Sequence, residues 1–261
     1  MAIHESPIWR SCRRWQRRRR ATLFALALAC SASLGAGFSD DAPWMGQPDA
    51  ARITAAMEAA QFDRKEHHNS WLGVEMLQYP GDLMTYQQLL VEVKPDLVVE
   101  TGTLSGGLSL YLASILQSLS PSAKLVTIDI DDTGWKQTLA THTFPKALLD
   151  RIHFIAGDSV GRDTWAKVTP HAADKKVLVI LDSLHSRSHV LRELNLYSQL
   201  VSVGSYIIVN DTHLDGTEWV KSGRGPYSAV KEFVAQHPEF EIVQQRFMIS
   251  CLHQGILRRT R

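Results

Sequence analysis

Cysteine is scarce in this sequence of 261 residues. Cys12, Cys30 and Cys251 are the three that it contains, and no two of them stand in a C-x-x-C pair. This count excludes a fold held together by several disulfides, and the cysteines do not have the sequence spacing that is typical of metal ligands. Cys251 is therefore interpreted as a packed thiol of the core.

An excess of either charge is also missing. The formal net charge is +1, with 21% charged and 44% hydrophobic residues, which is ordinary for a globular protein. Residues 1–20 contain seven Arg and one Glu, so the rest of the chain carries a net charge of −5. A mildly acidic body argues against nucleic acid as the main partner, because binding phosphates requires a basic face.

The basic N-terminus is followed by an apolar segment of small residues over 21–38. This order is typical of a secretory signal or a membrane anchor. It predicts that the protein is membrane-associated through this segment or is exported, or that it is cytoplasmic if the segment has no function. The expected organisation is a basic and apolar segment over 1–40, a linker with one helix over 41–64, and a folded domain over 65–261.

In that domain, short apolar runs alternate with segments of helical periodicity. Strands are predicted over 96–100, 124–129, 151–156, 176–182, 205–210, 240–245 and 256–258. Helices are predicted over 53–63, 83–93, 108–119, 190–201 and 226–236. Alternation of this kind predicts an α/β fold, with a doubly wound, mostly parallel seven-stranded sheet and helices on both faces.

The predicted strands end in polar residues. In open α/β sheets, ligands bind at the carboxyl ends of the strands. Five successive ends carry an acidic side chain at or just after the strand: Glu100, Asp129, Asp158, Asp182 and Asp211. The sequence therefore predicts a ligand site along this edge.

The segment 100–107, Glu-Thr-Gly-Thr-Leu-Ser-Gly-Gly, is the most specific of these ends. Gly102 allows a tight turn and a close approach of the backbone, and Gly106 and Gly107 let the next helix begin against a ligand. The spacing is neither the G-x-G-x-x-G of dinucleotide enzymes nor a P-loop. Glu100 before the glycines suits a cationic ligand such as S-adenosylmethionine, which carries a sulfonium and an ammonium group.

Two further carboxylates complete an expected adenosyl site. Asp129 can accept hydrogen bonds from a ribose diol, and Asp158 can meet the amino edge of adenine. The alternatives are a simple strand-end Asp at position 129 and a turn-forming Asp at position 158. An NAD-dependent oxidoreductase would share the strand-end carboxylate of Asp129, but this sequence lacks the glycine pattern of dinucleotide enzymes. For a hydroxylase on the same fold, no iron site of two His and one carboxylate is evident at a recognisable spacing.

A second group of polar residues follows the next two strands. Asp182, Asn210 and Asp211 offer oxygen atoms, a set that favours Mg²⁺; helix N-capping by the two aspartates is the alternative. His185 is a candidate general base for a substrate hydroxyl, against a capping or core hydrogen bond. If helical, His185, His189 and Glu193 would share one face.

Several blocks in order resemble one family. They are 97–107, 179–185, 189–194, 204–212, 225–226 and 255–258. Together they resemble the cephalosporin hydroxylase/rhamnosyl O-methyltransferase family over about residues 65–260. The resemblance implies a class I, Rossmann-like methyltransferase domain that transfers a methyl group from S-adenosylmethionine to a hydroxyl of a sugar, glycolipid or natural product.

The resemblance also assigns roles to residues. It implies cofactor binding by the loop of Gly102 and Thr103 and by Asp129, and Mg²⁺ near Asp182 and Asp211. We expect His185, or Asp211 with a metal, to remove the proton of the acceptor. Two positions depart from the family pattern: Asn210 stands where Glu is usual, and Leu184 where Asp is frequent. Both remove negative charge, so a catalytically silent S-adenosylmethionine-binding relative is the alternative. The sequence leaves the oligomeric state and the acceptor open.

Overall fold

The computed structural model describes residues 68–217, 220, 223–244, 247 and 250–261. The segments predicted over 1–40 and 41–64, with the helix expected over 53–63, lie outside the described residues. Among the described residues, no helix has the length and apolarity that a membrane crossing requires.

The elements alternate along the chain as the sequence predicts. The strands are β1 His68–Trp71, β2 Val74–Leu77, β3 Leu97–Thr101, β4 Lys124–Asp129, β5 Ile152–Ala156, β6 Val177–Leu181, β7 Tyr206–Val209, β8 Phe240–Ile242 and β9 Ile256–Arg259. The helices are α3 Pro80–Val93, α4 Gly107–Leu119, α5 Thr133–Thr141, α6 Lys146–Leu149, α7 Arg162–Ala172, α8 Arg187–Tyr197, the 3-10 turn η2 Thr212–Leu214, and α9 Pro226–Gln236.

Seven strands form one sheet in the order β5-β4-β3-β6-β7-β9-β8. The five strands from β5 to β7 are parallel, and β9 runs antiparallel to both β7 and β8. The order reverses between β3 and β6, which places a topological switch point at their carboxyl ends. The predicted doubly wound, mostly parallel seven-stranded sheet is confirmed.

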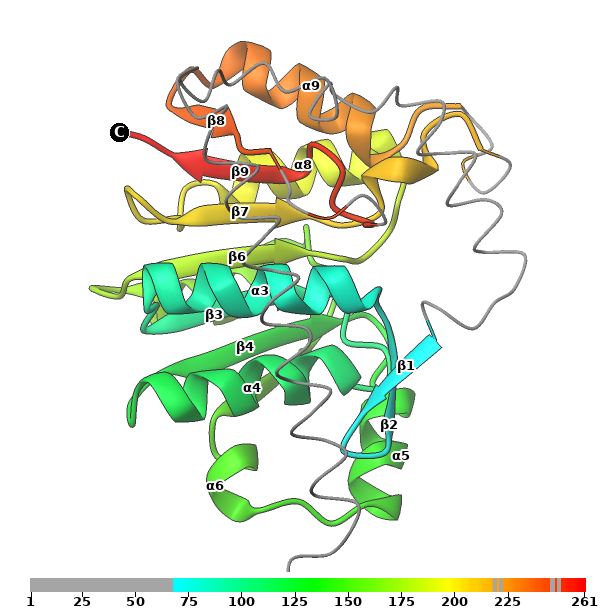
Figure 1. Cartoon of the computed structure of the whole chain (residues 1–261), viewed down its shortest axis with the longest axis vertical. Coiled ribbons are helices and arrows are strands. Elements are labelled where there is room, and N and C mark those ends of the chain that lie inside the picture. The colour runs from blue at the N-terminus through cyan, green and yellow to red at the C-terminus, as the bar shows by residue number, and fades with distance from the viewer. Residues whose placement is uncertain (1–67, 218–219, 221–222, 245–246, 248–249) are drawn as a thin grey trace, which may run out of the picture. The chain divides into compact units, whose positions relative to one another are not determined.

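Both faces of the sheet are covered, because its central strands are apolar on both sides. Val99 belongs to one buried cluster with Leu194 of α8 and Phe233 of α9. Its neighbour Val98 belongs to another, with residues of α3 and α4. Figure 1 shows α3 and α4 in front of the sheet and α8 behind it. Continuous apolar strands of this kind are typical of sheets buried on both faces.

Some elements differ from the prediction. The helix expected over 190–201 is α8, which begins at Arg187 and ends at Tyr197. The β1–β2 hairpin and helices α5, α6 and α7 were not predicted. The hairpin is half polar and α5 combines a weak apolar pattern with Gly134, while α7 contains Pro170, and all of these features obscure periodicity.

The unpredicted hairpin is attached to α4. The Trp71 indole Nε1 donates a hydrogen bond to Ser114 Oγ at 3.0 Å, and its ring packs edge-on against Tyr111 at 5.1 Å between centroids. Gly107 lies so close that a Cβ there would come within 2.1 Å of the Glu75 carbonyl oxygen. This packing brings β2 beside the carboxyl ends of the parallel strands.

Candidate active site

A cavity of about 610 Å³ lies at the carboxyl ends of β3 to β7. Its walls are the loops that follow these parallel strands, and residues 75–78 of the hairpin region form a further wall. This volume is in the range that holds a cofactor-sized molecule. The predicted position of the site, at the carboxyl edge of the sheet, therefore coincides with a cavity.

The glycines of the β3–α4 loop are required by the packing of the protein itself. Gly102 has φ +87°, and a Cβ there would lie 1.9 Å from the Asp182 carbonyl oxygen. At Gly106, also at φ +87°, a Cβ would collide with the Trp135 ring at 2.4 Å. Gly102 and Gly107 line the cavity, whereas Gly106 is not among its lining residues. The predicted close approach to the backbone of Gly102 is thus made by the backbone of Asp182, at the end of the neighbouring strand β6.

Glu100, near the end of β3, is not among the residues that line the cavity. Its side chain is fully buried and accepts a hydrogen bond from Ser109 Oγ. Burial raises the pKa of Glu100 to about 7, and the hydrogen bonds to Ser109 and Thr127 offset part of this rise. The sequence predicts that Glu100 contacts a cationic ligand directly, and this placement does not favour such a contact. The side chain is instead bonded to Ser109 of α4, the helix that follows the loop.

Asp129 organises the loop and also faces the cavity. Its Oδ2 accepts hydrogen bonds from the backbone N–H groups of Thr103 and Leu104, both at 2.9 Å. Its Oδ1 accepts one from the N–H of Asp131 at 3.0 Å. An ionised carboxylate has about four acceptor positions, so three hydrogen bonds leave capacity for a ligand hydroxyl. Thr103 and Asp129 both line the cavity.

Asp158 takes part in a turn and also lines the cavity. Its Oδ1 accepts a hydrogen bond from the N–H of Val160 at 3.1 Å, which forms a turn. It also lines the cavity, next to Gly157 and Ser159. The side chain is therefore fixed by the turn at a place where a ligand can reach it.

Asp182, His185 and Asp211 converge at the ends of β6 and β7. His185 Nε2 lies 3.0 Å from Asp211 Oδ2 and 3.6 Å from Asp182 Oδ1. All three residues line the cavity, and one ligand atom from each lies within 4.8 Å of the others. Neither aspartate caps a helix through its side chain, since α8 begins after Ser186 and Asp211 makes no side-chain cap to η2. The alternative of helix capping is therefore excluded.

This triad holds a proton on its histidine. Burial alone would lower the pKa of His185, but Asp182 and Asp211 outweigh burial and raise the pKa to about 10. Burial raises the pKa of Asp182 to about 6. In Asp211, burial is outweighed by His185, which helps to lower that pKa to about 2. In this arrangement His185 is a cation between two carboxylates, so it can act as the predicted base only after this proton has left.

Two residues far away in sequence, Tyr86 of α3 and Gln78 just before α3, bond to Asn210 and to Asp182 of the triad. Gln78 Nε2 donates a hydrogen bond to Asp182 Oδ2 at 2.9 Å. Tyr86 donates one to Asn210 Oδ1 at 2.7 Å. Asn210 is buried and is not among the residues that line the cavity. Its carbonyl oxygen accepts the hydrogen bond from Tyr86, and its role as a metal ligand stays a prediction. No sequence pattern links these distant residues.

His189 also lies on the cavity wall, on α8 and apart from His185, which precedes that helix. Its Nε2 lies 3.1 Å from Ser159 Oγ and 3.2 Å from Ser183 Oγ. Ser183 in turn donates a hydrogen bond to the buried Glu193 at 2.7 Å. Of the three residues predicted to share a helix face, only His189 and Glu193 lie on α8. Through Ser159 and Ser183, these two residues connect to the loops after β5 and β6.

The family model described as Rhamnosyl O-methyltransferase/CmcI matches residues 64–260. The chain belongs to this family. Rhamnosyl O-methyltransferase of Mycobacterium leprae (strain TN) is 29% identical over 172 residues, which are 65% of this chain and 72% of that protein. The protein of the same name from Mycobacterium tuberculosis (strain ATCC 25618 / H37Rv) is 27% identical over 179 residues, covering 65% and 67%.

Solved structures agree on the fold of this family member. A structure of CmcI with Mg and S-adenosylmethionine has a TM-score of 0.55 at 19% identity, covering 74% of this chain and 77% of that one. An O-methyltransferase from Bacillus cereus in complex with S-adenosylhomocysteine has a TM-score of 0.50 at 17% identity, covering 76% and 84%. The fold is that of class I methyltransferases, as predicted.

Family membership also decides the class of enzyme. The chain is an S-adenosylmethionine-dependent O-methyltransferase by family, and the oxidoreductase and hydroxylase alternatives are set aside. The cavity fits this cofactor, because carboxylates stand at the ends of β4 and β5 and two exposed apolar side chains, Leu104 and Ile130, lie beside them.

Proposed function

We propose that this methyltransferase acts on a sugar hydroxyl of an acceptor that also carries an apolar part. The observation that carries the proposal is the position of Asp182, His185 and Asp211, which share one cavity with the carboxylates of Asp129 and Asp158. One end of the cavity is thereby suited to an adenosyl group and the other to managing the proton of a hydroxyl. The names of the curated relatives, rhamnosyl O-methyltransferases, support a sugar as the acceptor.

The cofactor end would hold the adenosyl group through residues of three loops. Asp129 would accept from the ribose, Asp158 from adenine, and the exposed side chains of Leu104 and Ile130 would cover the apolar faces. S-Adenosylmethionine supplies a methyl group on a positively charged sulfur, so the donor needs no further activation. What the chain itself must contribute is placement of the acceptor oxygen, which is positioning catalysis.

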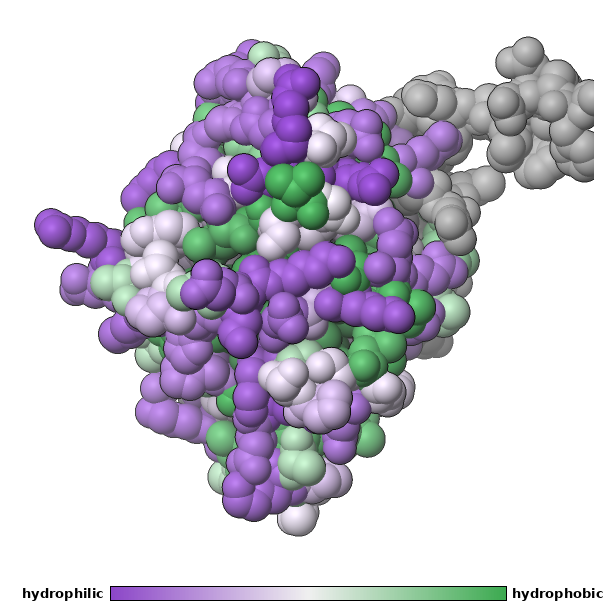
Figure 2. All heavy atoms as spheres, turned by 90° about the vertical axis from the view of Figure 1, so that its left-hand side faces the viewer, coloured by the Kyte–Doolittle hydropathy of each residue, from purple (hydrophilic) through white to green (hydrophobic). Residues whose placement is uncertain are grey.

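The acceptor end has an apolar border. Leu77 and Leu184 line the cavity beside Gln78 and His185, and they are 40% and 60% exposed. Exposed apolar side chains gathered at a cavity are typical of a binding surface. The surface at the amino ends of the parallel strands, where the antiparallel strand β9 ends, is mostly hydrophilic (Figure 2). An aglycone or a lipid chain attached to the sugar would therefore pack against Leu77 and Leu184.

The triad is suited to removing the proton of the acceptor hydroxyl. Asp211 holds the imidazole of His185 at 3.0 Å, and Gln78 orients Asp182. A divalent cation such as Mg²⁺ would be held by Asp182, Asp211 and His185, whose donor atoms lie within 4.8 Å of one another. When bound, such an ion lowers the pKa of a coordinated hydroxyl. Because a ligating imidazole must be neutral, binding of the ion through His185 would displace the proton of that residue to solvent. Without an ion on Nε2, His185 would act as the base once this proton has left.

The test is methyl transfer from radiolabelled S-adenosylmethionine by the full chain, with and without Mg²⁺. The acceptors are rhamnose, an alkyl rhamnoside and the same alkyl chain ending in a plain alcohol. We expect label in the alkyl rhamnoside, less in rhamnose, and none in the alcohol. Binding of the cofactor without transfer to any hydroxyl would contradict the proposal and favour the silent relative.

A variant locates the reaction within the cavity. His185→Asn should lower kcat by at least ~100-fold, which is the lower end of the usual contribution of acid–base catalysis. His142→Asn, at an exposed histidine that does not line the cavity, is the matched control and should keep the activity. Equal activity of the two variants would show that His185 does not handle the proton.

A further inference from the structure

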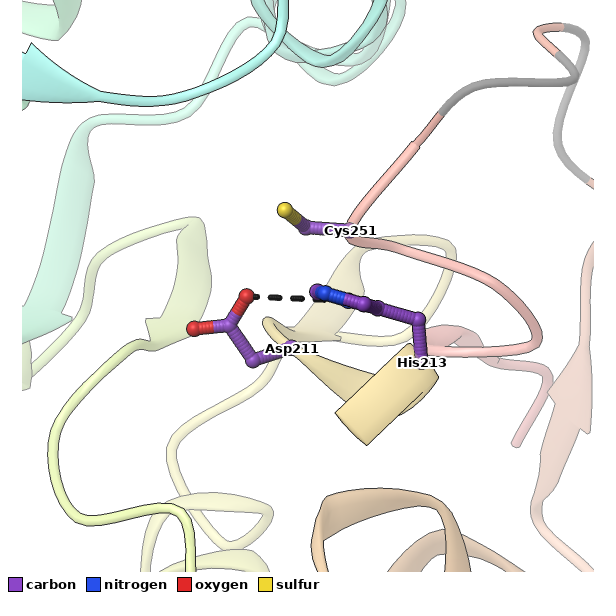
Figure 3. A group of neighbouring side chains, drawn as sticks. All are labelled: Asp211, His213 and Cys251. Carbon is purple, nitrogen blue, oxygen red and sulfur yellow. Dashed lines mark ion pairs between the residues drawn. The ribbon is translucent and has the colours of Figure 1, made fainter. Parts of the chain in front are cut away.

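A second group of metal-ligating side chains lies behind the active-site triad. Asp211, His213 and Cys251 each offer one ligand atom, and these atoms lie within 4.8 Å of one another. Figure 3 shows the carboxylate of Asp211, the ring of His213 and the thiol of Cys251 turned toward one region. His213 and Cys251 are buried, at 7% and 5% exposure. The set differs from the triad in that a thiol sulfur replaces one of the two carboxylates.

Hydrogen bonds hold the backbone of Cys251 in place beside the turn that carries Asp211 and His213. The loop before β9 returns to the turn after β7 because these strands are antiparallel neighbours. The backbone N–H and the hydroxyl of Thr212 both donate to the Cys251 carbonyl oxygen at 3.1 Å. From α3, the buried carboxylate of Asp82 accepts from the N–H of Cys251 at 2.8 Å and from Ser250 Oγ at 2.5 Å. The backbone of Cys251 is thus held by hydrogen bonds on two sides, through its carbonyl oxygen and its N–H.

The two carboxylate oxygens of Asp211 face two different histidines. Its Oδ2 faces His185 at 3.0 Å, and its Oδ1 faces His213 Nδ1 at 3.7 Å. Ligand atoms around a tetrahedral zinc ion are roughly 3.3–3.8 Å apart, since the ion lies about 2.0–2.3 Å from each. The distance between Asp211 Oδ1 and His213 Nδ1 already falls in this range, and the ligand atoms of all three residues lie within 4.8 Å of one another.

We propose that Asp211, His213 and Cys251 bind Zn²⁺ or a similar divalent ion that prefers nitrogen and sulfur ligands. Thiolate and imidazole select such ions over Mg²⁺, which prefers oxygen. The ion takes the place of the thiol proton, which passes to solvent. Three protein ligands leave a fourth position for water. Asp211 then joins this site to the oxygen-rich triad in the cavity.

Cobalt(II) is the probe, because a cobalt–thiolate bond gives a charge-transfer absorption in the near ultraviolet. The full chain is titrated with Co²⁺ in the presence of excess Mg²⁺. We expect this band to rise and to saturate at one Co²⁺ per chain, and Zn²⁺ to abolish it. A chain that shows no such band does not have the site.

Variants identify the sulfur and separate the two sites. Cys251→Ser should lose the band, whereas Cys12→Ser/Cys30→Ser, the matched control, should keep it. His213→Gln should weaken Co²⁺ binding by at least tenfold and tests the site even if Cys251→Ser does not fold, which circular dichroism reports. Asp182→Asn should keep the band, because Asp182 belongs to the triad alone. A band that persists in Cys251→Ser, or that disappears in Asp182→Asn, would overturn the proposal.

Discussion

At the scale of single residues, Gly102 shows how the packing of the protein itself can require a glycine. Replacing Gly102 by Ala forces a positive φ on a side chain and drives its Cβ against the Asp182 backbone. We expect Gly102→Ala to lower the free energy of unfolding by about 3 kcal/mol or more, because conformational strain and a backbone clash add. Urea unfolding followed by circular dichroism measures this loss.

Gly204 provides the control for that experiment. It has φ +79°, and a Cβ there would meet nothing within 4 Å. Gly204→Ala should therefore cost only the left-handed conformation, about 1–2 kcal/mol. If both variants lose the same stability, then the contact with Asp182 is not what requires the glycine.

Glu100 should make stability depend on pH. Its pKa is about 7 when folded, against a reference value of 4.5. The unfolded chain thus loses this proton first, so the contribution of Glu100 is fully present below about pH 4.5 and is lost as the pH rises through about 7. The difference in pKa corresponds to a change on the order of 3 kcal/mol.

Glu100→Gln removes this titration. Between about pH 4 and about pH 8, the unfolding free energy of the variant should rise relative to that of the wild type by on the order of 3 kcal/mol. Urea unfolding across this range measures the difference. Glu241→Gln, at a side chain that is 55% exposed, should run parallel to the wild type. If the unfolding free energies of Glu100→Gln and the wild type differ by the same amount at every pH, the folded state does not raise the pKa of Glu100, and the prediction is wrong.

At the scale of elements, the β1–β2 hairpin is expected to shape the acceptor end of the cavity. Trp71→Ala removes both the packing on Tyr111 and the hydrogen bond to Ser114. We expect the KM for the acceptor to rise about tenfold and the free energy of unfolding to fall by about 1–3 kcal/mol. Initial rates and urea unfolding give the two values.

Trp165 is the matched control for the hairpin. Its ring packs edge-on against Tyr197 at 5.6 Å between centroids, and it does not line the cavity. Trp165→Ala should therefore lower stability while leaving the KM unchanged. An equal rise of KM in both variants would show that lost stability, and not the position of the hairpin, controls acceptor binding.

The elements also show how far the sequence could lead. β3, β4 and β6 were predictable because buried parallel strands are apolar runs bounded by polar ends. The hairpin could not be predicted, since its register depends on packing against α4 and its exposed positions alternate weakly. The site residues also fall into a predictable and an unpredictable group. The predictable ones are the aspartates at strand ends: Asp129, Asp158, Asp182 and Asp211. The hydrogen bonds from Gln78 to Asp182 and from Tyr86 to Asn210 could not be predicted, because they join residues 104 and 124 positions apart.

At the scale of the whole molecule, the described residues contain a sheet with buried clusters on both faces. A chain of this kind should fold without the residues before 41. We therefore expect the 41–261 fragment to unfold cooperatively, with a free energy within about 1 kcal/mol of the full chain. Aggregation of the fragment would show that the N-terminal segment covers part of the body.

The same pair of chains tests what the N-terminal segment does. We propose that residues 21–38 attach the enzyme to a membrane, because an apolar segment behind a cluster of arginines favours anionic bilayers. A glycolipid acceptor would then be concentrated at the same surface as the apolar border of Leu77 and Leu184. In sedimentation with anionic vesicles, the full chain should bind and the 41–261 fragment should stay in solution. Binding of both would place the membrane contact on the folded domain. Binding of neither, with equal activity toward an alkyl rhamnoside, would indicate that the segment acts only as an export signal or has no role in the enzyme.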